Sequence, residues 1–185
     1  MTGQISDEVR YNGETYSLIG VNGEGLPVPV DFGMETTMAT TACWRGYQMF
    51  YACVDDEIFL DAMLANPIEV KPVNGVEPRK PKDGWGFKHF YEDIGLKIKF
   101  TGRILIGRDF IQEMYVHMGF QSAESYYDVL ELHVEDGNIV NVINLREVME
   151  QRRLQGRQKP STPSSMEDSD IRSWIENRFS QEYED

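Results

Sequence analysis

The sequence predicts a mainly β protein, either an antiparallel β-barrel or a two-sheet sandwich, followed by a C-terminal helix. Residues 47–64 and 127–143 each carry an aromatic-led apolar run, a short acidic turn and a second apolar run, which predicts two β-hairpins. Asp136-Gly137 is a strong hairpin signal, because a primed turn needs a positive φ that glycine adopts freely. We favour a barrel, because closure removes the edges that so many apolar strands would otherwise expose.

The two predicted hairpins also resemble each other in spacing. In each, seven positions separate the first tyrosine from the valine before the turn, Tyr47 to Val54 and Tyr127 to Val134. This spacing predicts an internal duplication in which the two hairpins superpose about a pseudo-twofold axis. Apolar runs with acidic turns are common in β proteins, and coincidence is the alternative.

The composition indicates a well-packed domain with an acidic surface. The 185 residues are 41% hydrophobic and carry a formal net charge of −13. The apolar content excludes a disordered chain, and an acidic surface repels phosphate, so no nucleic-acid partner is expected. The first eight residues lack the features of a signal peptide, and no apolar run is long enough to span a membrane. We expect a cytoplasmic protein without a membrane partner, in which Cys43 and Cys53 are free thiols.

The first third of the chain is expected to hold two hairpins joined by a loop. Asn12-Gly13 is a tight turn between strands at residues 9–11 and 15–21. Closely spaced glycines and prolines at residues 22–33 predict an ordered loop. The strand at residues 47–54 has apolar side chains at both odd and even positions, which predicts a strand covered on both faces.

The middle of the chain is expected to combine short strands with one short helix. Phe87, Phe90, Tyr91 and Ile94 are three to four residues apart, which predicts a helix within residues 85–95. The other predicted elements are an edge strand at 68–73, strands at 97–100, 103–106 and 110–118, a hairpin turn at 107–109 and a helical turn at 122–126.

The character of the chain changes after Leu145. Residues 146–154 predict a marginal helix, and the polar residues 155–165 predict a linker. Asp168 is expected to cap a final helix. Its apolar stripe consists of Ile171, Trp174, Ile175 and Phe179. A lone helix of this length is marginal in water, so the stripe needs a surface: its own barrel, a twin subunit in a homodimer, or another partner.

These patterns divide the chain into a β-rich domain at residues 1–149 and a linker with an amphipathic helix at residues 150–185. The composition of the linker implies few contacts across it. We therefore expect the domain to remain folded when residues 156–185 are removed.

The strongest ligand-binding candidates lie just before the first of the two similar hairpins. Gly46 precedes an apolar strand, which indicates that backbone there passes close to another element or to a ligand. Arg45 beside Trp44 can form a bidentate clamp for a carboxylate or phosphate. We therefore take Trp44, Arg45 and Tyr115 as candidate ligand-binding residues. In the alternative, Arg45 pairs with one of the many acidic residues and Trp44 fills the core.

Catalytic candidates come from two histidines and nearby carboxylates, because no established catalytic motif occurs. In a strand at residues 110–118, Glu113 and His117 share one face with Tyr115. Together with His89 or Glu92 they can form a general acid–base pocket or a two-histidine, one-carboxylate metal site. In the alternative, these histidines are exposed or structurally satisfied. The two cysteines have poor spacing for metal ligation, and the sequence predicts neither a metal site nor a cofactor.

Three stretches carry a resemblance. They read T-A-C-W-R-G-Y at residues 41–47, H-F-Y-E-D at 89–93 and Y-V-H-M-G-F at 115–120. Taken together they resemble stretches of uncharacterised bacterial proteins of similar length. The resemblance covers roughly residues 10–145 and implies a bacterial cytoplasmic origin. It brings no activity and no site residues.

The sequence leaves two functions from different classes. We predict a non-enzymatic binding protein, whose barrel mouth takes a small ligand or whose acidic face takes a basic protein. The alternative is a hydrolase or isomerase that uses His89 and His117 with nearby carboxylates. The two functions are separated by whether these histidines converge in one pocket.

Overall fold

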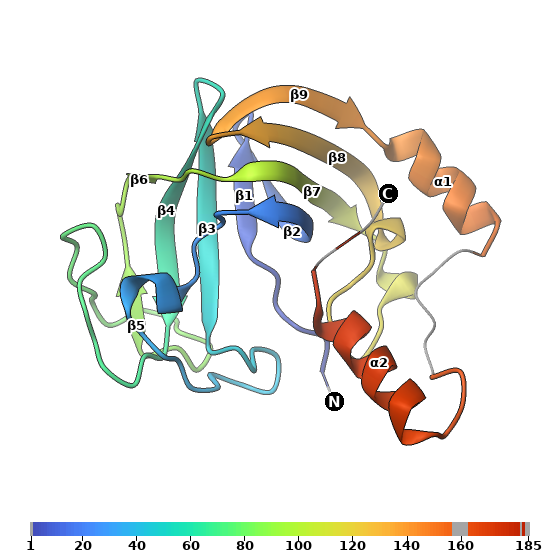
Figure 1. The fold of residues 1–185 in the computed structure, drawn as a ribbon, viewed down its shortest axis with the longest axis horizontal. Helices are drawn as coiled ribbons and strands as arrows, with labels where there is room; N and C mark the ends of the chain where they lie inside the picture. Colours follow the sequence, from blue (N-terminus) through green and yellow to red (C-terminus); the bar gives the residue numbers. More distant parts are fainter. Residues whose placement is uncertain (1, 157–162, 182, 184–185) are drawn as a thin grey trace.

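The sheet of this protein closes into a ring. The structure is a computed structural model that describes residues 2–156, 163–181 and 183. Its ring strands are β1 (Glu8–Tyr11), β2 (Glu14–Glu24), β3 (Tyr47–Val54), β4 (Glu57–Ala65), β7 (Thr101–Phe110), β8 (Tyr126–Glu135) and β9 (Asn138–Asn144). Within the described residues they follow the order β3-β1-β2-β7-β8-β9-β4, and β4 pairs again with β3 (Figure 1). This ring of seven strands confirms the mainly β class and the barrel.

Hairpins build most of the ring, as the sequence predicts. β1–β2, β3–β4 and β8–β9 are antiparallel pairs with tight turns, and β7 pairs antiparallel with both β2 and β8. One junction differs, because β1 runs parallel to β3. Local sequence signals cannot specify a parallel pair, since its two strands are joined through a long connection.

The two similar hairpins contact each other at their turns. The residues in contact are those that occupy equivalent positions in the two sequences. Glu57 opposes Asn138, the Ile58 amide donates to the Gly137 carbonyl at 2.9 Å, and the Ile139 amide donates to the Asp56 carbonyl at 2.7 Å. Equivalent positions thus exchange backbone bonds, as a local pseudo-twofold axis requires. The relation does not extend to the outer neighbours, because β3 lies parallel to β1 whereas β8 lies antiparallel to β7.

The edge of β4 that faces away from β3 pairs with three strands in turn. Beyond the contact with β9, it pairs with β6 (Leu96–Lys97) and then with β5 (His89–Tyr91). The helix predicted for residues 85–95 is therefore wrong. Trp85 and Gly86 have φ angles of 45° and 90°, which a helix does not accept, and pairing with β4 buries Tyr91 completely.

The hairpin turn predicted at residues 107–109 is also wrong, because β7 continues through it to Phe110. Gly107 opposes Val129, Arg108 opposes Asp128 and Phe110 opposes Tyr126, so the pairing with β8 keeps one register through this stretch. The predicted strand at 110–118 ends at once, since a short 3-10 helix, η2, occupies Gln112–Met114. The strand expected at 68–73 does not form, and within this range Val73 makes an isolated bridge to Val76. The helical turn at Ala123–Ser125 is present.

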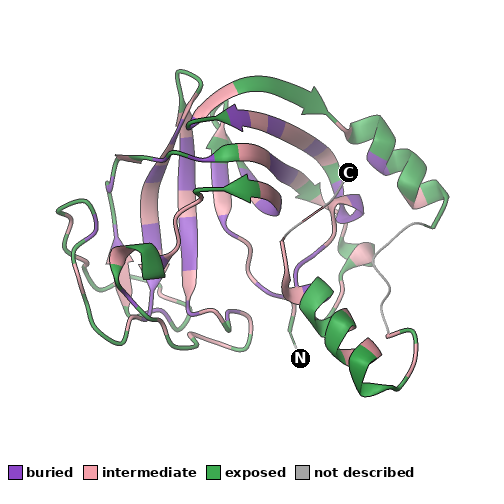
Figure 2. Ribbon diagram, viewed as in Figure 1, coloured by how far each residue is buried: buried purple, intermediate pink, exposed green. Residues whose placement is uncertain are grey.

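Two apolar cores support the barrel. The larger fills the ring interior, where Met49, Leu60, Phe100, Ile106 and Leu132 are fully buried. The smaller lies outside the ring, beneath helix α1 (Arg146–Leu154). Its members are Ile19, Leu105, Tyr126, Val129 and Met149. Figure 2 shows α1 mostly exposed, and Met149 is its buried residue. The predicted helix at 146–154 is confirmed, and it covers one outer face of the sheet.

Helix α2 (Asp168–Phe179) confirms the predicted final helix, with one change at its start. Glu167 occupies the cap position, and Asp170 accepts hydrogen bonds from the Ser164 and Ser165 hydroxyls at 2.9 and 2.7 Å. The stripe lies against its own barrel at one end, where the Phe179 ring stacks on Trp44 at 4.9 Å. No helix in the described part of the chain is long and apolar enough to cross a membrane.

Both cysteines are free, as predicted. Burial, with the charge of Asp56, raises the pKa of the Cys53 thiol to about 12 from 9.0, and burial also raises the pKa of Cys43. Since the thiolate is the reactive form, at about pH 8 we expect native Cys53 to react with dithiodipyridine about a thousandfold more slowly than an ordinary thiol. Two rapidly reacting thiols should appear only in urea. Rapid reaction of Cys53 in the native protein would contradict this placement.

Candidate functional site

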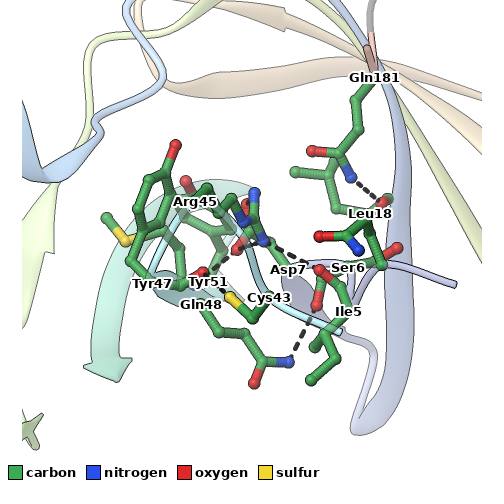
Figure 3. Close-up of polar contacts among 12 residues, drawn as sticks. Ile5, Ser6, Asp7, Leu18, Cys43, Arg45, Tyr47, Gln48, Tyr51 and Gln181 are labelled. Atoms are coloured by element: carbon green, nitrogen blue, oxygen red, sulfur yellow. Dashed lines mark hydrogen bonds and ion pairs between the residues drawn. The ribbon is translucent and has the colours of Figure 1, made fainter. Parts of the chain in front are cut away.

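The candidate site is built on a buried ion pair. Arg45 lies just before β3, and its two terminal nitrogens donate to the Asp7 carboxylate, Nη1 to Oδ2 at 3.0 Å and Nη2 to Oδ1 at 2.6 Å. Nη2 also donates to the Ile5 carbonyl at 3.3 Å, and Asp7 accepts a further hydrogen bond from the Met49 amide at 2.6 Å. Figure 3 shows the guanidinium directed at Asp7, with Tyr47 and Tyr51 beside it.

Burial governs the electrostatics of this pair. Only 20% of the Arg45 side chain and 5% of the Asp7 side chain are exposed. Burial raises the pKa of Asp7, against the opposing effects of Arg45 and the Met49 amide. Burial, the largest single effect, lowers the pKa of Arg45, but the charge and hydrogen bonds of Asp7 together with the effects of Tyr47 and Cys43 leave this pKa above its usual value. With three N–H donors on one carboxylate, we take both groups as charged at neutral pH.

The guanidinium of Arg45 is thus already paired within the protein. Its two terminal nitrogens donate to the Asp7 carboxylate, so the bidentate contact that the sequence suggests for a ligand carboxylate or phosphate is made with Asp7 instead. The Nε–H is buried and has no acceptor among the described residues. The guanidinium also lies over the Tyr47 ring at 4.7 Å and near the Phe120 ring at 5.5 Å. These contacts with aromatic rings stabilise the planar cation of Arg45.

Gly46 allows this arrangement, and the close approach expected there is present. Its φ is 74°, and a Cβ atom at this position would lie 2.0 Å from the Thr37 carbonyl oxygen. Its own carbonyl accepts the Asn66 amide at 2.9 Å. The close neighbour of Gly46 is therefore backbone of this chain. The turn at Gly46 directs the Arg45 side chain toward the barrel interior.

The ion pair lies at the wall of a large cavity. The cavity, called here the mouth cavity, has a volume of about 1680 Å³ and is partly open. One wall consists of barrel residues, among them Asp7, Val28, Arg45, Tyr47 and Tyr51. The facing wall comes from the C-terminal part of the chain, which contributes Asp170, Trp174, Arg178, Gln181 and Tyr183. The cavity thus lies between the end of the barrel and the C-terminal residues, with aromatic side chains on both walls.

Of the three predicted ligand-binding residues, Arg45 lines the mouth cavity. Trp44, 45% exposed, stacks on Phe179 of α2. Tyr115 lies elsewhere, where its hydroxyl accepts the Gly3 amide at 2.9 Å and its ring contacts His117 edge-on at 5.0 Å. Both residues hold chain segments against the barrel.

The predicted catalytic residues are not brought together. His89 lies on β5 beside β4, and Glu92 pairs with Arg79 at 2.7 Å. Glu113 lies on η2, which ends the face it was expected to share with His117. In Figure 1, β5 lies on the opposite side of the molecule from the end near α2, where the segment after η2 packs. Among the described residues, no group of three His, Cys, Asp or Glu is placed to hold a metal ion.

A second, smaller cavity of about 570 Å³ lies on the outer face of β1, β3, β4 and β5. Four of its charged groups form two ion pairs, Arg10 with Asp61 at 3.3 Å and Arg79 with Glu92 at 2.7 Å. These pairs are about half exposed, so they are well solvated. Phe50, Tyr51 and Phe90 line this groove, but its ion pairs are exposed, whereas the ion pair at the mouth cavity is buried.

Sequence reasoning missed Asp7 and the C-terminal wall. Asp7 is one of 31 acidic residues, and no neighbouring residue distinguishes it. Tyr47 and Tyr51 carry a signal that could have been used, because residues two and four apart on a strand share one face. Within β3 this rule places Tyr47 and Tyr51 on one face of the strand, and Tyr47 begins β3 two residues after Arg45.

No protein-family profile, curated protein sequence or solved structure matches this chain.

Proposed function

We propose that this protein is a binding protein whose mouth cavity takes a small, planar, partly apolar ligand. The observation that carries the proposal is the mouth cavity itself, at about 1680 Å³ with aromatic side chains on facing walls. Ligand pockets are commonly concave, mostly apolar and provided with a few convergent polar groups. Tyr47 and Tyr51 on one side and Trp174 on the other can enclose a flat ring.

The buried ion pair supports the proposal. An ion pair that is removed from water usually contributes less stability than apolar residues of the same size. Asp7 and Arg45 therefore do more than hold the fold when they are placed beside a cavity. Because their charges compensate each other, they offer a polar but neutral wall, which suits a ligand with a polar group and no full charge.

A blocking substitution tests the proposal. Val28 lines the mouth cavity, whereas Val30 of the neighbouring 3-10 helix is 63% exposed. The probe is N-phenyl-1-naphthylamine, an uncharged aromatic dye that fluoresces when it leaves water. We expect saturable binding to the folded protein, a loss of about tenfold or more in affinity for Val28→Trp, which fills the cavity, and unchanged affinity for Val30→Trp.

Two results would count against this function. The first is absence of dye binding to the wild-type protein, and the second is equal binding by the two tryptophan variants. Melting curves of both variants provide the control, since each must be folded for its affinity to be compared.

A second candidate, binding of a basic protein, rests on one observation. The hairpin turns that meet at the ring closure place the exposed carboxylates of Asp55, Asp56, Glu135 and Asp136 at one end of the barrel. Nearby, Lys97 pairs with Glu57 at 2.5 Å. The negative end of the molecule agrees with the net charge of −13.

A further inference from the structure

The C-terminal segment forms one complete wall of the mouth cavity. The name covers α2 and the described residues after it, Ser180, Gln181 and Tyr183. This wall faces the ion pair across the cavity. It does not belong to the strand ring, whose pairing is complete without it. Access to the ion pair therefore depends on where this segment lies.

Backbone and side-chain hydrogen bonds attach the segment to the barrel. The Val21 amide of β2 donates to the Gln181 carbonyl at 2.7 Å, and the Phe120 amide donates to the Arg178 carbonyl at 2.8 Å. The Gln181 side chain returns a hydrogen bond to the Leu18 carbonyl at 2.6 Å. The segment thus uses an edge of β2 that lies beyond the reach of β1, as peptides do when they add to a sheet.

Two glycines of the barrel leave room for the segment. A Cβ atom at Gly20 would lie 2.6 Å from the Tyr183 ring, and a Cβ atom at Gly119 would lie 2.2 Å from the Arg178 carbonyl oxygen. The Tyr183 hydroxyl donates to the Glu131 carboxylate at 2.9 Å. The barrel surface is shaped for this segment, so docking is a specific feature of the fold.

The rest of the segment is only lightly held. Figure 2 shows α2 largely exposed, and Ile175 in its stripe is 40% exposed. Its ring contact with the barrel is the stack of Phe179 on Trp44. Arg178, 2% exposed, is the buried residue of α2, and no apolar side chain of this helix is buried. The lack of buried apolar side chains is a feature of a unit that opens at low free-energy cost.

We propose that the C-terminal segment is a movable wall of the mouth cavity, which docks and undocks as one unit and is held closed by the bound ligand. A ligand that touches both walls favours the docked state, because it has contacts there that the undocked state lacks. The coupling to a ligand rests on the proposed function, whereas the docking equilibrium does not.

Hydrogen exchange of single amides tests the docking unit. The Val21 and Phe120 amides donate to the segment, while the Ile139 amide donates to Asp56 at the ring closure. Phe179→Ala removes the stack on Trp44 without altering the barrel. We expect it to speed exchange at Val21 and Phe120 by the same factor, about tenfold, and to leave Ile139 unchanged. Ile175→Ala, at a stripe position that is 40% exposed, is the matched control and should have little effect.

Three outcomes would overturn the docking unit. Exchange that speeds at only one of Val21 and Phe120 would show that the segment does not move as one unit. Unchanged exchange at both would show that the stack does not hold it. Equal acceleration at Ile139 would show that the segment unfolds together with the barrel.

The ligand coupling is tested with the same amides and saturating N-phenyl-1-naphthylamine. We expect the dye to slow exchange at Val21 and Phe120 in the wild-type protein, and not in the Val28→Trp variant. If the dye binds without slowing exchange, the coupling is wrong and the proposed function stands. If the dye does not bind, the proposed function and the coupling both fail, and the exchange of the dye-free variants still decides the docking unit.

Discussion

Replacing Asp7 by asparagine is expected to lower the free energy of unfolding by about 3–5 kcal/mol, because it leaves the buried charge of Arg45 without its partner. Asparagine keeps the shape and can still accept the Met49 amide, so the loss reports the charge. Urea unfolding followed by circular dichroism provides the measurement. The double variant Asp7→Asn, Arg45→Met should lose less than the sum of the two single variants, since it leaves no lone charge.

The exposed pair of Arg10 and Asp61 provides the matched control. Its atoms lie 3.3 Å apart, but 58% of the Arg10 side chain and 40% of the Asp61 side chain are exposed. Asp61→Asn should therefore change the unfolding free energy by less than about 1 kcal/mol. A loss of similar size for Asp7→Asn would mean that solvent reaches Arg45 and that the pair is not structural.

The second large effect is expected at Gly137, in the turn that closes the ring. Its φ is 80°, and a Cβ atom there would lie 2.0 Å from the Ile98 carbonyl oxygen. Gly137→Ala should cost about 1–2 kcal/mol from the positive φ. The collision with backbone adds about 1–3 kcal/mol, because neither chain can move without disturbing the closure of β9 on β4.

Gly13 separates the two contributions. It has the same φ of 80° after a residue that also has positive φ, but a Cβ atom there would meet no atom within 4 Å. Gly13→Ala should therefore show the backbone cost alone, about 1–2 kcal/mol. Thermal unfolding of both variants measures the difference. Equal losses would show that the Ile98 carbonyl can yield and that ring closure is not rigid at this point.

The sequence identified the hairpins well, because their signals are local. The turns at Asn12-Gly13 and Asp136-Gly137 have the positive φ angles that their residues favour. The incorrect predictions concern segments whose secondary structure depends on pairing with a strand far away in the sequence. Residues 89–91 have helical apolar spacing, yet pairing with β4 makes them a strand, and β7 passes through the predicted turn at 107–109 because β8 continues beside it.

The candidate site likewise combines features that the local sequence indicates with features that distant residues determine. Arg45 was found because an arginine and a glycine before an apolar strand are unusual, and the expected close backbone approach at Gly46 is present. Its partner could not be chosen from the sequence, since 31 acidic residues compete for one guanidinium. The separation of His89 from His117 likewise follows from strand order, which single-residue patterns do not encode.

By itself, then, the sequence determined the β class, the hairpin turns, the two helices at residues 146–154 and 168–179 and the free cysteines, since each depends on residues close together in the chain. Only the tertiary structure decided which strands close the ring, that Asp7 takes the fork of Arg45, and that the C-terminal segment faces them across a cavity. Those choices depend on burial and on partners far apart in the sequence, such as Val21 and Gln181, whose hydrogen bond forms only once the barrel presents a free strand edge.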